Sequence, residues 1–180
     1  HRNLQRTVKT RKELLYDLSA AVKRRVVLLA GAPDHHAGMY MMPIGDNTVM
    51  VGDPAAGAKL LTAQTGYDYK KLFSPNAPDL SPATQARFDA VADQCKSAGY
   101  RVIRMPLLTS SDGRTYLTSL NAILDQHVVY MPTFDNADAL NQAAARIWQE
   151  AGYQVRPINC TKSYKYFGTL RCLVNVLRRD

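Results

Sequence analysis

The sequence lacks a long hydrophobic run. No stretch approaches the roughly 18 apolar residues that indicate a membrane-spanning helix, so we expect no membrane partner. The chain of 180 residues is 46% hydrophobic and 21% charged, as in an ordinary folded protein. That length is enough to bury a core, either as a single domain over residues 1–180 or as the C-terminal part of a larger one.

Cysteine is scarce, and its spacing excludes several kinds of site. Cys95, Cys160 and Cys172 leave at least one thiol unpaired, and none has metal-ligand spacing with another cysteine or histidine. A structural zinc site is therefore not expected, and we expect no other metal ion and no cofactor. Cys95 lies on the inward side of an expected helix and Cys160 follows an expected strand, so packing is favoured for both. A disulfide between them stays open as an alternative.

A long run of one charge is also missing, although the net charge is +8. The basic residues are scattered, without zinc-finger spacing, an RNA-binding aromatic signature or a long basic stretch. This pattern is typical of a solvated basic face, and we expect no nucleic-acid partner.

The most informative segment is Gly168-Thr-Leu-Arg-Cys172. It places a thiol shortly after a glycine, at the start of an apolar stretch (Leu173, Val174, Val176, Leu177) that favours a strand. A structural cysteine would point into the core. A nucleophilic one needs a positively charged, partly open setting, and Arg171 supplies one such charge. The segment alone leaves both interpretations open.

A repeat indicates how the chain is organised. Ala98-Gly-Tyr-Arg-Val102 recurs as Ala151-Gly-Tyr-Gln-Val155. In each copy we expect the glycine to end a helix in the left-handed conformation and the following residues to begin a strand.

Local signals predict the remaining elements. Helices should begin at Thr10, whose capping box includes Glu13, at Ser81-Pro82, and after Asp135 or Asn136. Residues 26–29 favour a strand, and hairpins are expected at 39–51 and 120–131. Residues 54–82, which contain four prolines, resemble a long surface loop. The fold class is therefore α/β, built from repeated hairpin-helix-strand units that stack on one another.

Several segments together resemble the pentein-fold guanidine-modifying enzymes, which include agmatine, arginine and peptidylarginine deiminases and the amidinotransferases. Residues 130–134, the helix after them and residues 168–172 are similar to the last module of that fold. His36, Met39 and Tyr40 resemble the family's His-x-Asp-Met-Phe segment, and Asn121 stands where agmatine deiminases carry an asparagine.

This resemblance implies an α/β propeller of five modules around a pseudo-fivefold axis, with strands near the axis and helices outside. A chain of 180 residues supplies about three of the five modules. We therefore expect an upstream segment or a second chain to complete the fold.

The resemblance also implies a cysteine-dependent hydrolase, a deiminase, that acts on the guanidino group of a small molecule or a peptide. Cys172 would attack the guanidinium carbon and form a covalent thiouronium intermediate, with His36 as general acid and base. Asp34, Asn121 and Arg171 would contact the substrate. Gly38 stands where the family usually has a guanidinium-binding aspartate.

Each of these residues has a simpler interpretation. His36, like His35 and His127, could be structural, and Asp34 could belong to a turn. Asn121 could bind backbone groups, and Arg171 could point to solvent. Two other functions stay open: an amidinotransferase that uses the same Cys172 and His36, and an inactive pentein-like binding module, which Gly38 favours.

Overall fold

The computed structural model describes residues 10–34, 36–63 and 68–175. The chain divides into two compact units, His1–Ala30 and Gly31–Asp180. In the described part of the chain, no helix is both long enough and apolar enough to cross a membrane.

The first unit contains helix α1 (Arg11–Val22), none of whose residues is buried. The predicted capping box is confirmed, because the Thr10 side chain accepts from the Glu13 N–H and the Glu13 carboxylate accepts from the Thr10 N–H. The strand predicted at 26–29 is wrong: these residues are irregular. A strand needs a ladder partner, and the described strands pair with one another without this segment.

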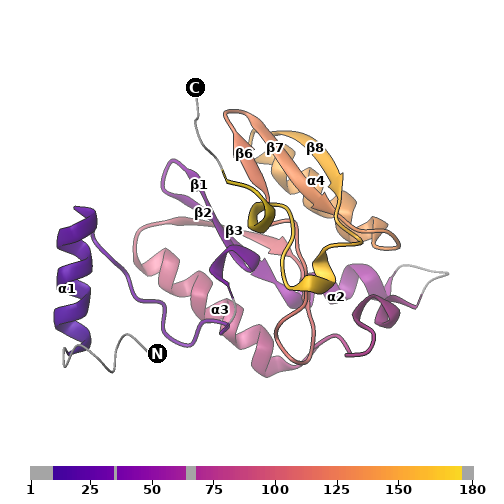
Figure 1. The fold of residues 1–180 in the computed structure, drawn as a ribbon, viewed down its shortest axis with the longest axis horizontal. Helices are drawn as coiled ribbons and strands as arrows, with labels where there is room; N and C mark the ends of the chain where they lie inside the picture. The colour runs from indigo at the N-terminus through magenta and orange to yellow at the C-terminus, as the bar shows by residue number, and fades with distance from the viewer. Residues whose placement is uncertain (1–9, 35, 64–67, 176–180) are drawn as a thin grey trace. The chain divides into compact units, whose positions relative to one another are not determined.

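The second unit holds two three-stranded sheets of the same topology (Figure 1). In the first sheet, β1 (Met41–Gly45) pairs antiparallel with β2 (Thr48–Asp53), which pairs parallel with β3 (Arg101–Pro106). In the second, β6 (Ile123–Asp125), β7 (Val128–Thr133) and β8 (Gln154–Asn159) repeat this order.

Helices make the parallel crossovers of both sheets, so the predicted order of hairpin, helix and strand is confirmed in each. Helices α2 (Pro54–Thr62) and α3 (Pro82–Ser97) connect β2 with β3, and α4 (Asp138–Glu150) connects β7 with β8. The short strands β4 (Leu108–Thr109) and β5 (Tyr116–Leu117) pair antiparallel with each other. Along the chain they come after the first sheet and before the second.

Left-handed residues make the predicted turns. Asp46 and Asn47 have φ of 44° and 50°, as a two-residue type I′ hairpin requires, and Gln126 has φ of 47° in the second hairpin. Gly99 and Gly152, the glycines of the repeat, have φ of 94° and 93° where their helices end. The repeat therefore marks the same helix-to-strand junction twice.

The long loop predicted at 54–82 is wrong in part, because it contains α2 and the 3-10 helix η2 (Tyr69–Phe73). Asp53 caps α2 by accepting from the Ala56 N–H at 3.1 Å, and Pro54 occupies its first turn. An aspartate followed by proline is a helix-start signal, so this helix was visible in the sequence.

The predicted start of α3 is confirmed, since Ser81 caps it and Pro82 opens it. The predicted cap of α4 is wrong: residue 137 is the N-cap and makes no side-chain capping bond. Asp135 instead accepts a hydrogen bond from the Asn159 amide at 2.7 Å, which commits its carboxylate to the end of β8.

The core fixes the C-terminal segment against the rest of the second unit. One cluster of buried residues joins α2, η2, the β4–β5 pair and α4 with residues 160–164; its members are Leu61, Leu72, Phe73, Leu108, Leu117, Phe134, Ala137, Leu140, Cys160 and Tyr164. The buried Tyr164 hydroxyl donates to the Leu72 carbonyl at 2.6 Å. Its ring lies edge-on to Phe134, with centroids 5.4 Å apart. These contacts fix the chain shortly before Cys172.

Close packing of α2 gives a test of this arrangement. A Cβ at Gly57 would overlap the Leu107 carbonyl oxygen. Alanine normally stabilises a helix interior by about 1 kcal/mol relative to glycine. At this position we expect Gly57→Ala to lower the free energy of unfolding by about 1–3 kcal/mol, because backbone must move. Urea unfolding measures it, and Lys59→Ala on the exposed side of α2 should change stability by less than about 0.5 kcal/mol.

Candidate functional site

The segment that carries Cys172 is a single 3-10 turn, η4 (Arg171–Leu173), so the strand predicted there is wrong for the described residues. Val176 and Leu177, which belonged to the predicted strand, lie outside them. The Cys172 thiol is exposed and unpaired. In Figure 1 the coil of η4 lies between the two three-stranded sheets.

One buried amide holds this turn. Asn121 is 1% exposed, and its Oδ1 accepts from the Thr169 N–H at 3.2 Å, the Thr169 hydroxyl at 2.9 Å and the Cys172 N–H at 3.4 Å. The Asn121 carbonyl accepts from the Arg171 N–H at 3.0 Å. Four donors from residues 169–172 therefore converge on one residue, because the turn has no ladder of its own to satisfy them.

The same amide reaches the segment that follows His36. Asn121 Nδ2 donates to the Gly38 carbonyl at 3.3 Å. Gly38 lies in the 3-10 helix η1 (Ala37–Met39), where the His36 carbonyl accepts from the Met39 N–H at 2.9 Å. Asn121 thus bridges the two segments that carry the expected nucleophile and the expected acid and base.

The side chain of His36 is exposed, and the fully buried Met39 anchors the turn beneath it. That the His36 imidazole and the Cys172 thiol face each other stays a prediction.

The backbone at Gly168 lies close to the Cys172 side chain, and a larger residue would crowd it. A Cβ at this position would lie 2.9 Å from the Cys172 Cβ and 3.2 Å from its Sγ. The sequence showed the glycine and the cysteine four residues apart, but only the turn brings them into contact. Gly168 and Thr169 were not among the site residues predicted from the sequence. Thr169 bonds to Asn121, which is distant in sequence, and Gly168 approaches Cys172 only because the chain turns there.

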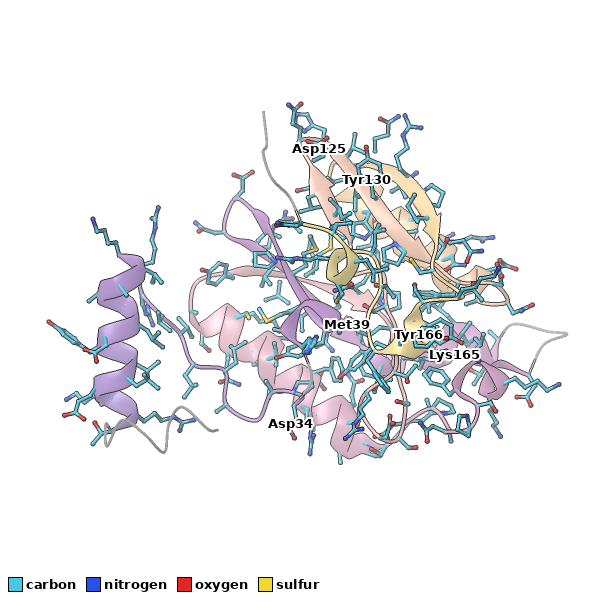
Figure 2. The ribbon with its side chains drawn as sticks, viewed as in Figure 1. Asp34, Met39, Asp125, Tyr130, Lys165 and Tyr166 are labelled. Carbon is cyan, nitrogen blue, oxygen red and sulfur yellow. The ribbon has the colours of Figure 1, made fainter. Side chains whose placement is uncertain are left out.

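Asp34, two residues before His36, lines a different pocket from Arg171. It lies beside α3 in Figure 2, where it lines a pocket of about 590 Å³ together with Arg87, Arg114 and Tyr116. Burial, with the Asp34 charge as a lesser cause, raises the pKa of Tyr116 to about 12. The hydrogen bonds of Asn121 described above do not include Asp34.

Arg171 lies beside the thiol. Its backbone N–H donates to the Asn121 carbonyl, and the residue lines a second pocket, of about 420 Å³, together with residues of β1 and β6. The structure thus gathers Gly38, Asn121, Arg171 and Cys172. Their contacts with a substrate stay predictions, as does that of Asp34.

The other two thiols are packed. Cys95 and Cys160 are each 5% exposed, and burial raises the pKa of both. Both are unpaired, so the disulfide left open between them does not form. Over residues 10–34, 36–63 and 68–175, no three acidic, histidine or cysteine side chains are grouped to hold a metal ion.

Solved structures share this fold. The agmatine deiminase of C. jejuni aligns with a TM-score of 0.58 at 13% identity, over 94% of this chain and 47% of its own. The chain has a deiminase fold. A substrate-bound cysteine-to-serine variant of that enzyme gives 0.55 at 12% identity, over 91% of this chain and 45% of its own. A Porphyromonas gingivalis structure assigned as an arginine deiminase aligns with a TM-score of 0.60 at 19% identity. The alignment covers 91% of this chain and 46% of that structure's chain.

The resemblance inferred from the sequence is thus confirmed for the fold, as a mixed α/β structure with small sheets. This chain spans about half the length of these deiminases. No family model matches the chain, and no curated protein matches it.

The Asn121 bridge can be tested against a matched asparagine. Asn141 holds a different turn, because its amide bonds both the N–H and the carbonyl of Phe134. We expect Asn121→Ala and Asn141→Ala each to lower the free energy of unfolding by about 2–4 kcal/mol, since both leave backbone groups unsatisfied. Only Asn121→Ala should change the rate at which iodoacetamide alkylates Cys172 in the native protein. Equal alkylation rates in both variants would contradict the role given to Asn121.

Proposed function

We propose that this chain is part of a cysteine-dependent deiminase, a hydrolase of guanidino groups, with Cys172 as nucleophile and His36 as general acid and base. The observation that carries the proposal is the Asn121 bridge between the Gly38 and Cys172 segments, in a chain with a deiminase fold. The substrate-bound C. jejuni agmatine deiminase carries serine in place of one cysteine, which fits a role for a thiol in that enzyme.

The chemistry follows from the residue types. The Cys172 sulfur attacks the guanidinium carbon, and His36 donates a proton to the departing nitrogen, so that ammonia leaves and a thiouronium remains. His36 then takes a proton from water as the water oxygen attacks the same carbon. The carbon–sulfur bond breaks, the thiolate returns, and the guanidino group has become a ureido group.

The two three-stranded sheets and the β4–β5 pair would be three of the five modules of a pentein-type propeller. The chain covers 45–47% of the deiminase structures it resembles. An upstream segment or a second chain would then supply the rest of the propeller and further substrate-binding carboxylates.

Gly38 supports a second candidate, an inactive binding module. A guanidinium is normally gripped by carboxylates through bidentate hydrogen bonds, and position 38 carries none. An amidinotransferase, the other alternative, would use the same Cys172 and His36, and an added amine acceptor would then be incorporated into the product.

Alkylation and turnover test the nucleophile. If Cys172 is held as a reactive thiolate, iodoacetamide at pH 7 should modify it faster in the native protein than in the urea-unfolded chain, because only the native site stabilises the thiolate. Cys95 and Cys160 should react more slowly when native than when unfolded, since burial raises their pKa and excludes the reagent.

In the same design, Cys172→Ser should abolish release of ammonia from arginine, agmatine or an arginine peptide. His36→Gln should lower turnover about 10²- to 10⁴-fold. His127→Gln, which changes an exposed histidine at a hairpin turn, is the matched control and should leave turnover unchanged. A slow native Cys172 and no ammonia from any of these substrates would favour the inactive module.

Restoring the carboxylate at position 38 tests the guanidine proposal separately. The Gly38 backbone is not left-handed, and an added Cβ would lie 3.4 Å from Asn121 Nδ2, so a side chain needs only a small adjustment there. Gly38→Asp should tighten binding of arginine or agmatine about ten- to hundredfold, as expected for a charge-assisted partner worth about 1.5–3 kcal/mol. Thermal unfolding checks the fold. A folded variant that binds neither compound would weaken the deiminase proposal.

A further inference from the structure

The hydroxyl of Thr169 is buried three residues before Cys172. Thr169 is 0% exposed, and its Oγ1 donates to Asn121 Oδ1 at 2.9 Å. The Asn121 carbonyl oxygen lies 3.5 Å from the same hydroxyl, at the limit of a hydrogen bond. A threonine hydroxyl carries one proton, so the side-chain oxygen of Asn121 is its better partner.

This bond is the shortest that the Asn121 amide makes. The amide oxygen also accepts from the Thr169 N–H at 3.2 Å and from the Cys172 N–H at 3.4 Å, and the amide nitrogen donates to the Gly38 carbonyl at 3.3 Å. Three donors thus share one oxygen that has two lone pairs. By its length, the bond from the hydroxyl is the strongest single constraint on the direction of the amide.

The direction of this amide decides how two segments meet. Its oxygen faces the turn that carries Cys172, and its nitrogen faces Gly38. If the amide rotates, both bonds are lost together, because acceptor and donors belong to one planar group. The chain is also close to the thiol here, since a Cβ at Gly168 would lie 3.2 Å from Cys172 Sγ. A displacement of residues 168–169 is therefore expected to move the thiol.

We propose, on the basis of the function proposed above, that Thr169 is a positioning residue for the reaction. Its hydroxyl fixes the Asn121 amide, and through that amide it holds the turn that carries Cys172 against the turn that follows His36. Thr169 is fully buried and has no surface to offer a substrate, so it acts through Asn121.

Two substitutions at this position isolate the hydroxyl. Thr169→Val keeps the shape of the side chain and removes the hydroxyl, whereas Thr169→Ser keeps the hydroxyl and removes a methyl group. For ammonia release from arginine and agmatine, we expect Thr169→Val to lower kcat about tenfold, the factor that one hydrogen bond of about 1.4 kcal/mol represents. KM should change less than about twofold, because the residue does not bind the substrate. Thr169→Ser should restore kcat to within about threefold of the unchanged protein.

Hydrogen exchange follows the same turn without requiring turnover. In Thr169→Val we expect the Cys172 backbone N–H to exchange about tenfold faster, measured by NMR, because its acceptor no longer has a fixed position. In Thr169→Ser the exchange rate should stay that of the unchanged protein. Thermal unfolding checks the fold, and Thr169→Ala, which also lacks the hydroxyl, replaces Thr169→Val if that variant does not fold.

The matched control is Thr48→Val. Thr48 is 3% exposed, and its hydroxyl donates to the Asp46 carbonyl at 3.2 Å and accepts from Arg101 Nε at 3.1 Å. This substitution removes a buried, hydrogen-bonded hydroxyl outside the contacts of Asn121, so it should lower thermal stability to a similar extent. It should leave both kcat and the exchange of the Cys172 N–H unchanged.

The outcomes separate this inference from the proposed function. If Thr169→Val leaves kcat and exchange unchanged while ammonia is still released, the inference is overturned and the deiminase stays in place. Slower exchange of the Cys172 N–H would also overturn it, because the hydroxyl would then compete with that N–H for the Asn121 oxygen. Equal losses of kcat in Thr169→Val and Thr48→Val would overturn it as well, since the effect would be one of general stability. Faster exchange with no ammonia from the unchanged protein would support the role of Thr169 in the turn and overturn the hydrolase.

Discussion

A single side-chain amide, that of Asn121, organises the candidate site. It is buried, and it offers one oxygen to the backbone and hydroxyl of Thr169 and to the backbone of Cys172, and one nitrogen to Gly38. In a low-dielectric interior such bonds are strong, and losing them leaves polar groups that water cannot reach. The turn that carries the thiol therefore depends on a residue about fifty positions earlier in the chain.

The fold supplies the frame for that amide. Two sheets of the same topology place β1 and β6 beside the cysteine-bearing turn. The Tyr153 hydroxyl, just before β8, donates to the Ile44 carbonyl of β1 at 2.8 Å and so joins the two sheets. Tyr164 anchors the chain in the core shortly before the turn. Residues 164–172 are thus held at one end by Tyr164 in the core and at the other end by hydrogen bonds to Asn121. An exposed thiol can therefore occupy a defined position without being buried.

The sequence was most informative where structure is local. The Thr10 capping box, the start of α3 at Ser81-Pro82 and the Asp46-Asn47 turn follow from neighbouring residues, and all are present. Failures occurred where a distant partner decides the conformation. Residues 26–29 have strand-forming side chains but no ladder, and residues 168–173 form a turn because Asn121 binds their donors. Cys172 and His36 could be selected from their resemblance to deiminases, whereas Thr169 and Gly168 acquire their roles only in three dimensions.

The outer edge of β8 limits how another chain can join this fold. Pro157 lies in the middle of β8, paired with Met131 of β7, and β8 ends its sheet. Proline has no N–H to donate, and the adjacent charged, exposed Arg156 adds a group that resists dehydration. One ladder hydrogen bond is therefore missing along this edge, which disfavours a further strand and protects the sheet from edge-to-edge aggregation. Any chain that packs on this side of the sheet is therefore expected to contact it through side chains and not through a continued ladder.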